Sequence, residues 1–175
     1  MSVEAPHSGG PNPHRQAPDP EASARRVTAF LAAHGLADAI VQFERSTKTA
    51  QLAADAMGCE LGQIAKSLVF LADGQPVLVL VAGDRRGDAV AIADEMGGSR
   101  ARLADAATVE AVTGYTVGGV SPFDLPAGLP VLIDRSLTRY GTVYPAAGTP
   151  ASMVGLTLGQ LIEVTGGRLA DVSSA

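Results

Sequence analysis

Histidine and cysteine are almost absent from this chain, and their scarcity limits the chemistry that it can perform. All three histidines lie in the first fifth of the sequence, at His7, His14 and His34. From residue 35 onward the chain therefore cannot supply a Ser-His-Asp or Cys-His arrangement or a His/Cys zinc site. The single cysteine, Cys59, excludes an intrachain disulfide and indicates a reducing compartment. Lysine is also scarce, with only Lys48 and Lys66, and we expect neither a metal nor a cofactor.

Long hydrophobic runs and an excess of positive charge are missing as well. No run of about 18 apolar residues occurs, and the N-terminus lacks the layout of a secretory signal, so we expect a cytoplasmic protein without a membrane span. The net charge is −5, from 13 Lys and Arg against 18 Asp and Glu, which excludes a generic binder of polyanions. A nucleic-acid partner would have to bind a local basic patch, weakly and with a steep salt dependence.

Apolar residues are plentiful enough for one folded domain. They make up 46% of the chain, against 18% charged residues, which excludes disorder throughout. Residues 1–18 differ from the rest, because they contain four prolines and two adjacent glycines and almost nothing apolar. We expect a disordered tail over 1–18 and a single domain over 19–175.

Capping residues and hydrophobic spacing predict an alternation of helices and strands. Asp19-Pro20 begins a helix that Gly35 ends, and Ser46 or Thr47 caps a second helix through Met57. The spacing of Leu52, Ala53 and Ala56 places them on the inner face of that second helix. The other elements expected are helices over Asp88–Met96, Asp105–Thr113 and Thr157–Val164, and strands over Ala39–Phe43, Pro130–Ile133 and Thr142–Tyr144.

The strongest strand signal is a hairpin. Ser67–Leu71 and Val77–Val81 are apolar runs joined by a four-residue connection that contains Asp73-Gly74. Because neither run alternates between apolar and polar residues, both strands are expected at the centre of the sheet. The chain is therefore predicted to be an α/β domain with a central mixed, largely antiparallel sheet flanked by helices.

Lys66 is the first residue that could carry chemistry, since it stands at the head of a predicted central strand. An ammonium in that position must reach solvent, pair with a carboxylate or face a polar pocket, because isolated burial is too costly. Asp134 follows another predicted strand and could pair with such a cation, or could instead cap the helical turn that begins at Ser136. Position alone leaves these alternatives open.

Two glycine-containing loops could border a ligand. The first, over 114–123, contains Gly118-Gly119 followed by Ser121-Pro122, so that its backbone can approach a ligand closely. The second, over 144–150, contains Gly148 among small residues and could form the floor of a pocket for a small side chain. Each is also compatible with an ordinary turn. A third candidate feature is a phosphate-binding face, formed by Arg85, Arg86, Arg100, Arg102, Arg135 and Arg139, although scattered surface arginines are the default.

Four short segments, taken in their order and spacing, point to a known family. They are Ala65–Val69, Gly114–Pro122, Leu132–Asp134 and Val143–Gly148. This series resembles the YbaK/ProX family of aminoacyl-tRNA deacylases, which is similar to the editing insertion of bacterial prolyl-tRNA synthetase. The resemblance extends over about residues 38–172, and the absence of a synthetase body matches the trans-acting members.

The resemblance implies a reaction and a set of site residues. The reaction is hydrolysis of the ester between a wrong amino acid, such as Cys, Ala or Ser, and the terminal adenosine of a tRNA, with the tRNA for proline as the expected substrate. An aminoacyl-tRNA synthetase is a candidate partner. The catalytic residues expected are Lys66, Gly118 and Gly119, and the substrate-binding residues expected are Thr47, Ser67, Ser121, Pro122, Asp134 and Gly148.

A second function remains open at this point. A module of the same fold could bind an amino acid or a nucleoside, or associate with a synthetase, without catalysis. In that case Lys66 would serve only as a counter-ion, and ligand binding would occur without turnover.

Overall fold

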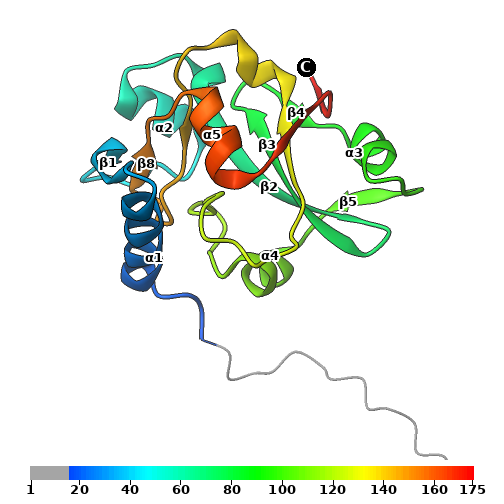
Figure 1. Cartoon of the computed structure of the whole chain (residues 1–175), viewed down its shortest axis with the longest axis horizontal. Coiled ribbons are helices and arrows are strands. Elements are labelled where there is room, and N and C mark those ends of the chain that lie inside the picture. Colours follow the sequence, from blue (N-terminus) through cyan, green and yellow to red (C-terminus); the bar gives the residue numbers. More distant parts are fainter. Residues whose placement is uncertain (1–15) are drawn as a thin grey trace, which may run out of the picture.

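The computed structural model describes residues 16–175 (Figure 1). The predicted disorder of the tail falls largely on residues 1–15, which lie outside the described residues. Helix α1 (Pro20–Ala33) begins as expected, with Asp19 as its N-cap accepting a hydrogen bond from the Glu21 N–H and Pro20 in the first turn.

The core of the fold is a mixed sheet in the order β5-β2-β3-β6-β9. A short strand, β7, also pairs with β2. Strands β2 (Ile64–Ala72) and β3 (Gln75–Ala82) form the predicted hairpin, in which Asp73 and Gly74 both have positive φ. The β2–β3 and β2–β5 pairs are antiparallel, and the β3–β6, β6–β9 and β2–β7 pairs are parallel. The predicted α/β class with a mixed central sheet is confirmed. The remaining strands of the sheet are β5 (Ala101–Leu103), β6 (Val131–Asp134), β7 (Tyr144–Pro145) and β9 (Arg168–Ala170).

Helices cover both faces of this sheet. One face packs with α1, α4 (Ala106–Thr113) and α5 (Leu158–Thr165), and the other face packs with α3 (Ala89–Glu95) and the C-terminal segment. Figure 1 shows α1 beside the two-stranded pair of β1 (Ile40–Gln42) and β8 (Ser152–Val154), and α3 next to β5. The C-terminal strand β10 (Ser173–Ser174) pairs with β4 (Arg86–Gly87). Single-turn helices lie at Ala37–Ala39, Leu61–Gln63 and Arg135–Arg139.

Helix α2 (Ala50–Met57) departs from the expected start. Its N-cap is Thr49, whose hydroxyl accepts from the Leu52 N–H, and not Ser46 or Thr47. The Thr47 hydroxyl instead donates to the Pro150 carbonyl, so a long-range contact takes the residue that local sequence favours as the cap.

The inner face of α2 is also different from the expected one. Ala53 and Ala54 are buried against Ile64, whereas Leu52 and Ala56 are exposed. Among residues 16–175, no helix is both long enough and apolar enough to cross a bilayer.

Candidate active site

A cavity opens where one edge of β2 loses its neighbouring strands. β5 pairs with β2 along Phe70–Ala72 and β7 pairs with it along Ile64–Ala65, so the stretch between them has no strand on that side. A cavity of about 350 Å³ lies along this gap. Its lining comes from the segment leading into α2, from β2, from β5 and its continuation, and from two loops, namely Thr47–Ala50, Ala53, Ile64–Val69, Leu103, Ala104, Val109, Val117, Gly118, Val120, Ala146, Thr149 and Met153.

The open edge of β2 presents backbone groups to this cavity. Alternate residues of an antiparallel strand direct their N–H and C=O toward the same neighbour. The Val69 carbonyl accepts from the Ala104 N–H, and the Asp73 N–H donates to the Arg100 carbonyl, so the odd-numbered residues of β2 face the β5 side. Ser67 therefore directs its N–H and C=O to the stretch where no strand pairs with β2.

Ser67 also contributes a side chain without a partner. Its hydroxyl oxygen is buried, and within residues 16–175 it makes no hydrogen bond. A buried hydroxyl in a cavity wall normally bonds to protein, water or ligand. This oxygen is enclosed by protein atoms, so the groups that Ser67 offers at the open edge are its backbone N–H and C=O.

Lys66 lies on the same strand, and its amine does not extend into bulk solvent. The side chain is half-buried, and Nζ donates a hydrogen bond to the Arg85 carbonyl. Burial lowers the pKa of Lys66; the nearby Asp84 carboxylate opposes this shift, and Arg86 adds to it. Lys66 and Gly118 line the same cavity, so the structure brings the predicted cation and the predicted loop together.

Asp84 is prevented from pairing fully with Lys66 by an arginine on its other side. Arg139 donates two hydrogen bonds to its carboxylate, at 2.9 and 2.6 Å. These hydrogen bonds hold the pKa of Asp84 below its usual range. The Lys66 ammonium therefore lies close to a carboxylate whose charge is already largely compensated.

The 114–124 loop contributes fewer residues to the cavity than the sequence suggested. Gly118, with φ +96°, lines it beside the Lys48 side chain. Gly119 packs against the Thr149 backbone instead, where an added Cβ would lie 3.0 Å from the Thr149 Cα.

Ser121 and Pro122 are buried behind the cavity wall and do not line it. The Ser121 side chain lies next to Tyr115, whose hydroxyl donates to the Phe123 carbonyl at 2.6 Å. Burial raises the pKa of Tyr115 to about 12, so this phenol stays protonated and acts as a donor within the loop. These residues shape the loop from inside.

Two of the expected substrate-binding residues lie elsewhere. Gly148 packs on α1, since an added Cβ would lie 2.9 Å from the Ser23 carbonyl oxygen, and its neighbours Ala146 and Thr149 line the cavity instead. Asp134 lies outside the cavity and is 2% exposed.

The carboxylate of Asp134 holds the C-terminal segment in place. It accepts from the Ser136 N–H at 3.0 Å, the Val172 N–H at 2.8 Å and the Ser173 hydroxyl at 2.7 Å. Burial alone would raise the pKa of Asp134, but these hydrogen bonds lower it below its ordinary value. The capping role is confirmed, and the contacts leave this carboxylate no place in a pocket for substrate.

Arg26, on α1, contacts the 114–124 loop, a contact that sequence reasoning missed. Its guanidinium donates to the Asp124 carboxylate at 3.0 Å and to the Asp124 carbonyl at 2.6 Å, and it reaches the Gly114 carbonyl at 3.5 Å. It also lies over the Tyr115 ring, 4.5 Å from the centroid. One side chain thus holds both ends of the 114–124 loop. No sequence signal links residues so far apart.

Lys48 was missed as well, although a signal existed. It is one of only two lysines, it follows Thr47, and both residues line the cavity with Lys66. The polar residues of the lining are therefore Thr47, Lys48, Thr49, Lys66, Ser67 and Thr149, and Gly118 adds its backbone.

Comparison with known proteins identifies the family to which the chain belongs. Residues 44–164 match the model of the aminoacyl-tRNA editing domain, and this span covers more than half of the chain. The chain therefore belongs to the aminoacyl-tRNA editing domain family, and the resemblance inferred from the sequence is confirmed. Helix α1, with Arg26, lies outside the matched span.

Three similar proteins illustrate the relationship. An uncharacterized Bacillus subtilis protein, YwhH, is 38% identical over 125 residues, covering 71% of this chain and 79% of its own length. The Escherichia coli multifunctional Ser/Thr-tRNA deacylase ProXp-y is 33% identical over 117 residues, covering 65% of this chain and 70% of its own. A crystal structure described as that of a candidate trans-editing enzyme for prolyl-tRNA synthetase is 38% identical, with a TM-score of 0.80 over 87% of this chain and 98% of that one.

Proposed function

We propose that this protein hydrolyses, in trans, the ester that joins a wrongly attached amino acid to the 3′-terminal adenosine of a tRNA. The observation that carries the proposal is that Lys66, Gly118 and the open edge at Ser67 line one cavity, in a member of the editing family. Since aminoacyl-tRNA is used where translation occurs, the proposal includes a cytoplasmic location.

The reaction needs little chemistry from side chains, which fits a site without histidine. Water attacks the ester carbonyl, an oxyanion develops on the carbonyl oxygen, and the bond to the ribose oxygen then breaks. The ribose oxygen takes up one proton of the water, and the amino acid leaves as its carboxylate while the second proton passes to solvent. The neighbouring ribose hydroxyl can relay the proton from the water to the leaving oxygen, so a protein base is not required.

Each site group has a part in this scheme. The Lys66 ammonium orients the aminoacyl-adenosine and stabilises the developing negative charge, a contribution of roughly 10²–10³ in rate for a well-placed donor. Backbone groups at Gly118 position the ribose hydroxyl or the attacking water. The Ser67 carbonyl at the open edge is placed to accept from the substrate α-ammonium.

Small amino acids, such as Cys, Ala or Ser, are the proposed acyl groups, and the tRNA for proline is the proposed carrier. Five alanines contribute to the lining of the cavity, at Ala50, Ala53, Ala65, Ala104 and Ala146, which leaves room for small side chains. A single methylene changes such discrimination by about 10- to 200-fold, so more than one small amino acid should be removed at a measurable rate. The prolyl relationship is supported by the structural neighbour described as a trans-editing enzyme for prolyl-tRNA synthetase.

A panel of mischarged tRNAs tests this proposal. Alanyl-, seryl-, cysteinyl- and prolyl-esters of the proline tRNA are incubated with the wild type and with Lys66→Ala, and the remaining ester is measured over time. We expect rapid loss of one or more small aminoacyl esters with the wild type only. Tight binding without hydrolysis of any ester would favour a non-catalytic binding module and would overturn the proposal.

A further inference from the structure

The cationic side chains of this acidic protein fall into two groups. Within residues 16–175, five arginines lie within 4.0 Å of a carboxylate: Arg25, Arg26, Arg135, Arg139 and Arg168. The other cations of this part of the chain have no carboxylate within that distance: Arg45, Lys48, Lys66, Arg85, Arg86, Arg100 and Arg102. The phosphate-binding face expected from the sequence is thus divided, because Arg135 and Arg139 are already paired.

The unpaired cations lie on segments that line the cavity or adjoin its lining. Lys48 and Lys66 line it, and Arg45 precedes Lys48 on the same exposed segment. The Arg85 carbonyl accepts from Lys66, and Arg86 lies close enough to lower the pKa of Lys66. Arg100 and Arg102 precede Leu103, the residue of β5 that lines the cavity.

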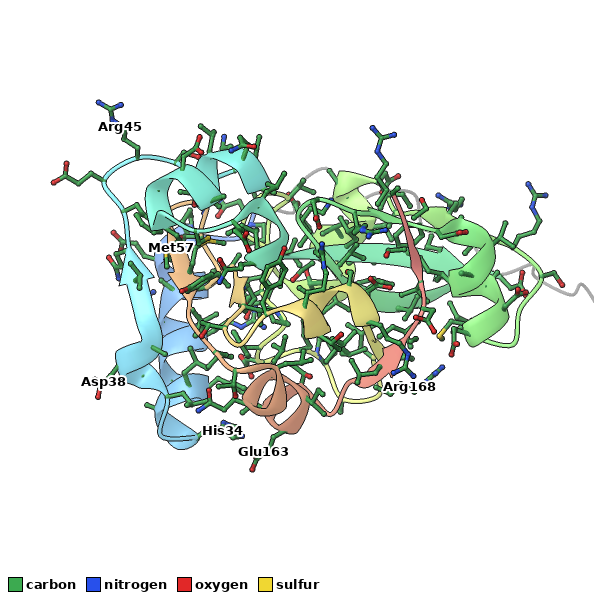
Figure 2. The ribbon with its side chains drawn as sticks, turned by 90° about the horizontal axis from the view of Figure 1, so that it is seen from above. His34, Asp38, Arg45, Met57, Glu163 and Arg168 are labelled. Atoms are coloured by element: carbon green, nitrogen blue, oxygen red, sulfur yellow. The ribbon has the colours of Figure 1, made fainter. Side chains whose placement is uncertain are left out.

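Two of these segments lie against each other on the Lys66 side. A Cβ at Gly83 would lie 3.3 Å from the Ala50 Cβ, so the 83–87 turn packs on the start of α2. We call Arg45, Lys48, Arg85 and Arg86 the basic rim. Figure 2 shows Arg45 extending outward from the loop before α2, on the opposite side of the molecule from Arg168 and Glu163.

Few carboxylates compensate the basic rim. Segments 44–50 and 83–87 contain only Glu44 and Asp84, and Arg139 already binds Asp84 through two hydrogen bonds. The whole chain, in contrast, has a net charge of −5. The basic rim is thus a local excess of positive charge on an acidic protein, and a polyanion is expected to approach there.

We propose that the basic rim binds the phosphates of the tRNA acceptor end whose terminal aminoacyl-adenosine enters the cavity. This inference rests on the proposed function. A strand that ends in the cavity must carry its preceding phosphates across the cavity mouth, where arginine and lysine are the usual phosphate ligands. These contacts add affinity but read no base sequence, so they should act on every tRNA alike.

The test measures binding of an uncharged acceptor-stem RNA hairpin that ends in CCA and carries a 5′-fluorescein. Fluorescence anisotropy gives its Kd over a series of KCl concentrations for the wild type, Arg45→Gln, Arg45→Gln/Arg86→Gln and the control Arg168→Gln. The control removes one positive charge from a paired site on the opposite side.

We expect each removed contact to weaken binding roughly three- to tenfold and to reduce the slope of log Kd against log[KCl] by about 0.7–0.9. The double variant should lose about twice the slope of the single variant, and Arg168→Gln should retain the wild-type slope. A double variant with the wild-type slope would overturn the proposal, as would an equal loss in Arg168→Gln, which would indicate a net-charge effect only.

Hydrolysis of aminoacyl-adenosine separates this inference from the proposed function. That ester has no further phosphates, so the double variant should lose about ten- to a hundredfold more activity on aminoacyl-tRNA than on the small ester. If the wild type hydrolyses neither ester but the hairpin binds through the rim, the proposed function fails and the basic rim stands. If both esters are hydrolysed and the rim variants lose both equally, the rim inference fails and the function stands.

Discussion

The two walls of the cavity are built in different ways. The Lys66 wall belongs to the longest hairpin of the sheet, and its amine is held by the Arg85 carbonyl beside a carboxylate that Arg139 already binds. The opposite wall is the 114–124 loop, which has little regular structure and is held by the Arg26 guanidinium. The first wall supplies a charged group from a regular strand. The second wall supplies backbone groups, and α1 holds them in position through Arg26.

This difference predicts that substitutions in the two walls have different effects. Changes in the Lys66 wall should alter the chemistry and its pH dependence with little effect on the fold. Changes in the loop wall should displace the backbone groups that position the substrate, and activity should fall for that reason. The following predictions are arranged from the largest expected effect to the smallest.

Lys66→Met should produce the largest loss of activity, about 10²–10³-fold in kcat/KM, because it removes the cation from the site. It should not lower the Tm. Burial lowers the pKa of Lys66, so the protonated amine is less favourable in the folded state than in the unfolded one. Removing that charge offsets the lost hydrogen bond to Arg85. Deacylation rates and thermal unfolding measure the two effects. A steep fall of Tm together with activity would indicate a structural role instead.

Gly118→Ala should reduce activity by about 10- to 100-fold, since small displacements of positioning groups are costly. Gly128→Ala is a matched control, because both glycines have positive φ, +96° and +85°. Each substitution should lower the free energy of unfolding by about 1–2 kcal/mol through the same backbone strain. Only the change at Gly118 should reduce deacylation. Equal losses of activity in the two variants would show that strain, and not the loop position, is responsible.

Arg26→Ala should reduce kcat about tenfold with a smaller change in KM, because both ends of the 114–124 loop lose their common contact. Hydrogen exchange of that loop should become faster. Arg26→Lys, which can still bind the Asp124 carboxylate, should restore part of the rate.

The control for Arg26 is its neighbour on the same helix. Arg25 makes only exposed ion pairs with Asp19 and Glu21, so Arg25→Ala should have little effect. A loss in Arg25→Ala as large as in Arg26→Ala would assign the effect to helix stability and would contradict the positioning role.

Asp84→Asn should have the smallest effect, a shift of the pH profile. Asp84 raises the pKa of Lys66, so its neutralisation lowers that pKa further. A reaction that needs the protonated amine is lost as pH rises through this pKa, so the alkaline limb of kcat/KM should move to lower pH. Asp171→Asn, which removes an exposed partner of Arg135, should leave the limb in place. A shift of the limb to higher pH in Asp84→Asn would contradict the electrostatic account.

The sequence was informative where signals are local. The Asp73-Gly74 turn between two apolar runs predicted the β2–β3 hairpin, and Asp19, Asp88 and Asp105 are the N-caps of their helices. Lys66 could be singled out because lysine is rare and stands at the head of a strand. These features depend on neighbours in the sequence.

Features that depend on tertiary contacts could not be predicted. β5, β8 and β9 have three residues each, too few for a pattern, and they pair with distant strands. The Thr47 hydroxyl bonds to Pro150 across 103 positions, and Thr49 is the N-cap of α2 instead.

Gly148 and Asp134, two of the expected substrate-binding residues that do not line the cavity, have the same explanation. The sequence shows Gly148 as part of a small-residue loop but cannot show that α1 lies against it. It likewise shows Asp134 after a strand but not that Val172 and Ser173 return to bind its carboxylate. In both cases a distant segment uses the group that looked available for substrate.

Chemical rescue of Lys66→Ala tests the central claim, that a cation at this one position drives ester hydrolysis. Single-turnover deacylation of a small aminoacyl-tRNA that the wild type hydrolyses is measured for the variant alone, with ethylammonium, and with ethanol as a neutral control of similar size. We predict a rate reduced by about 10²–10³-fold that ethylammonium partly restores and ethanol does not. A variant that hydrolyses the ester as fast as the wild type, with no added amine, would contradict the account.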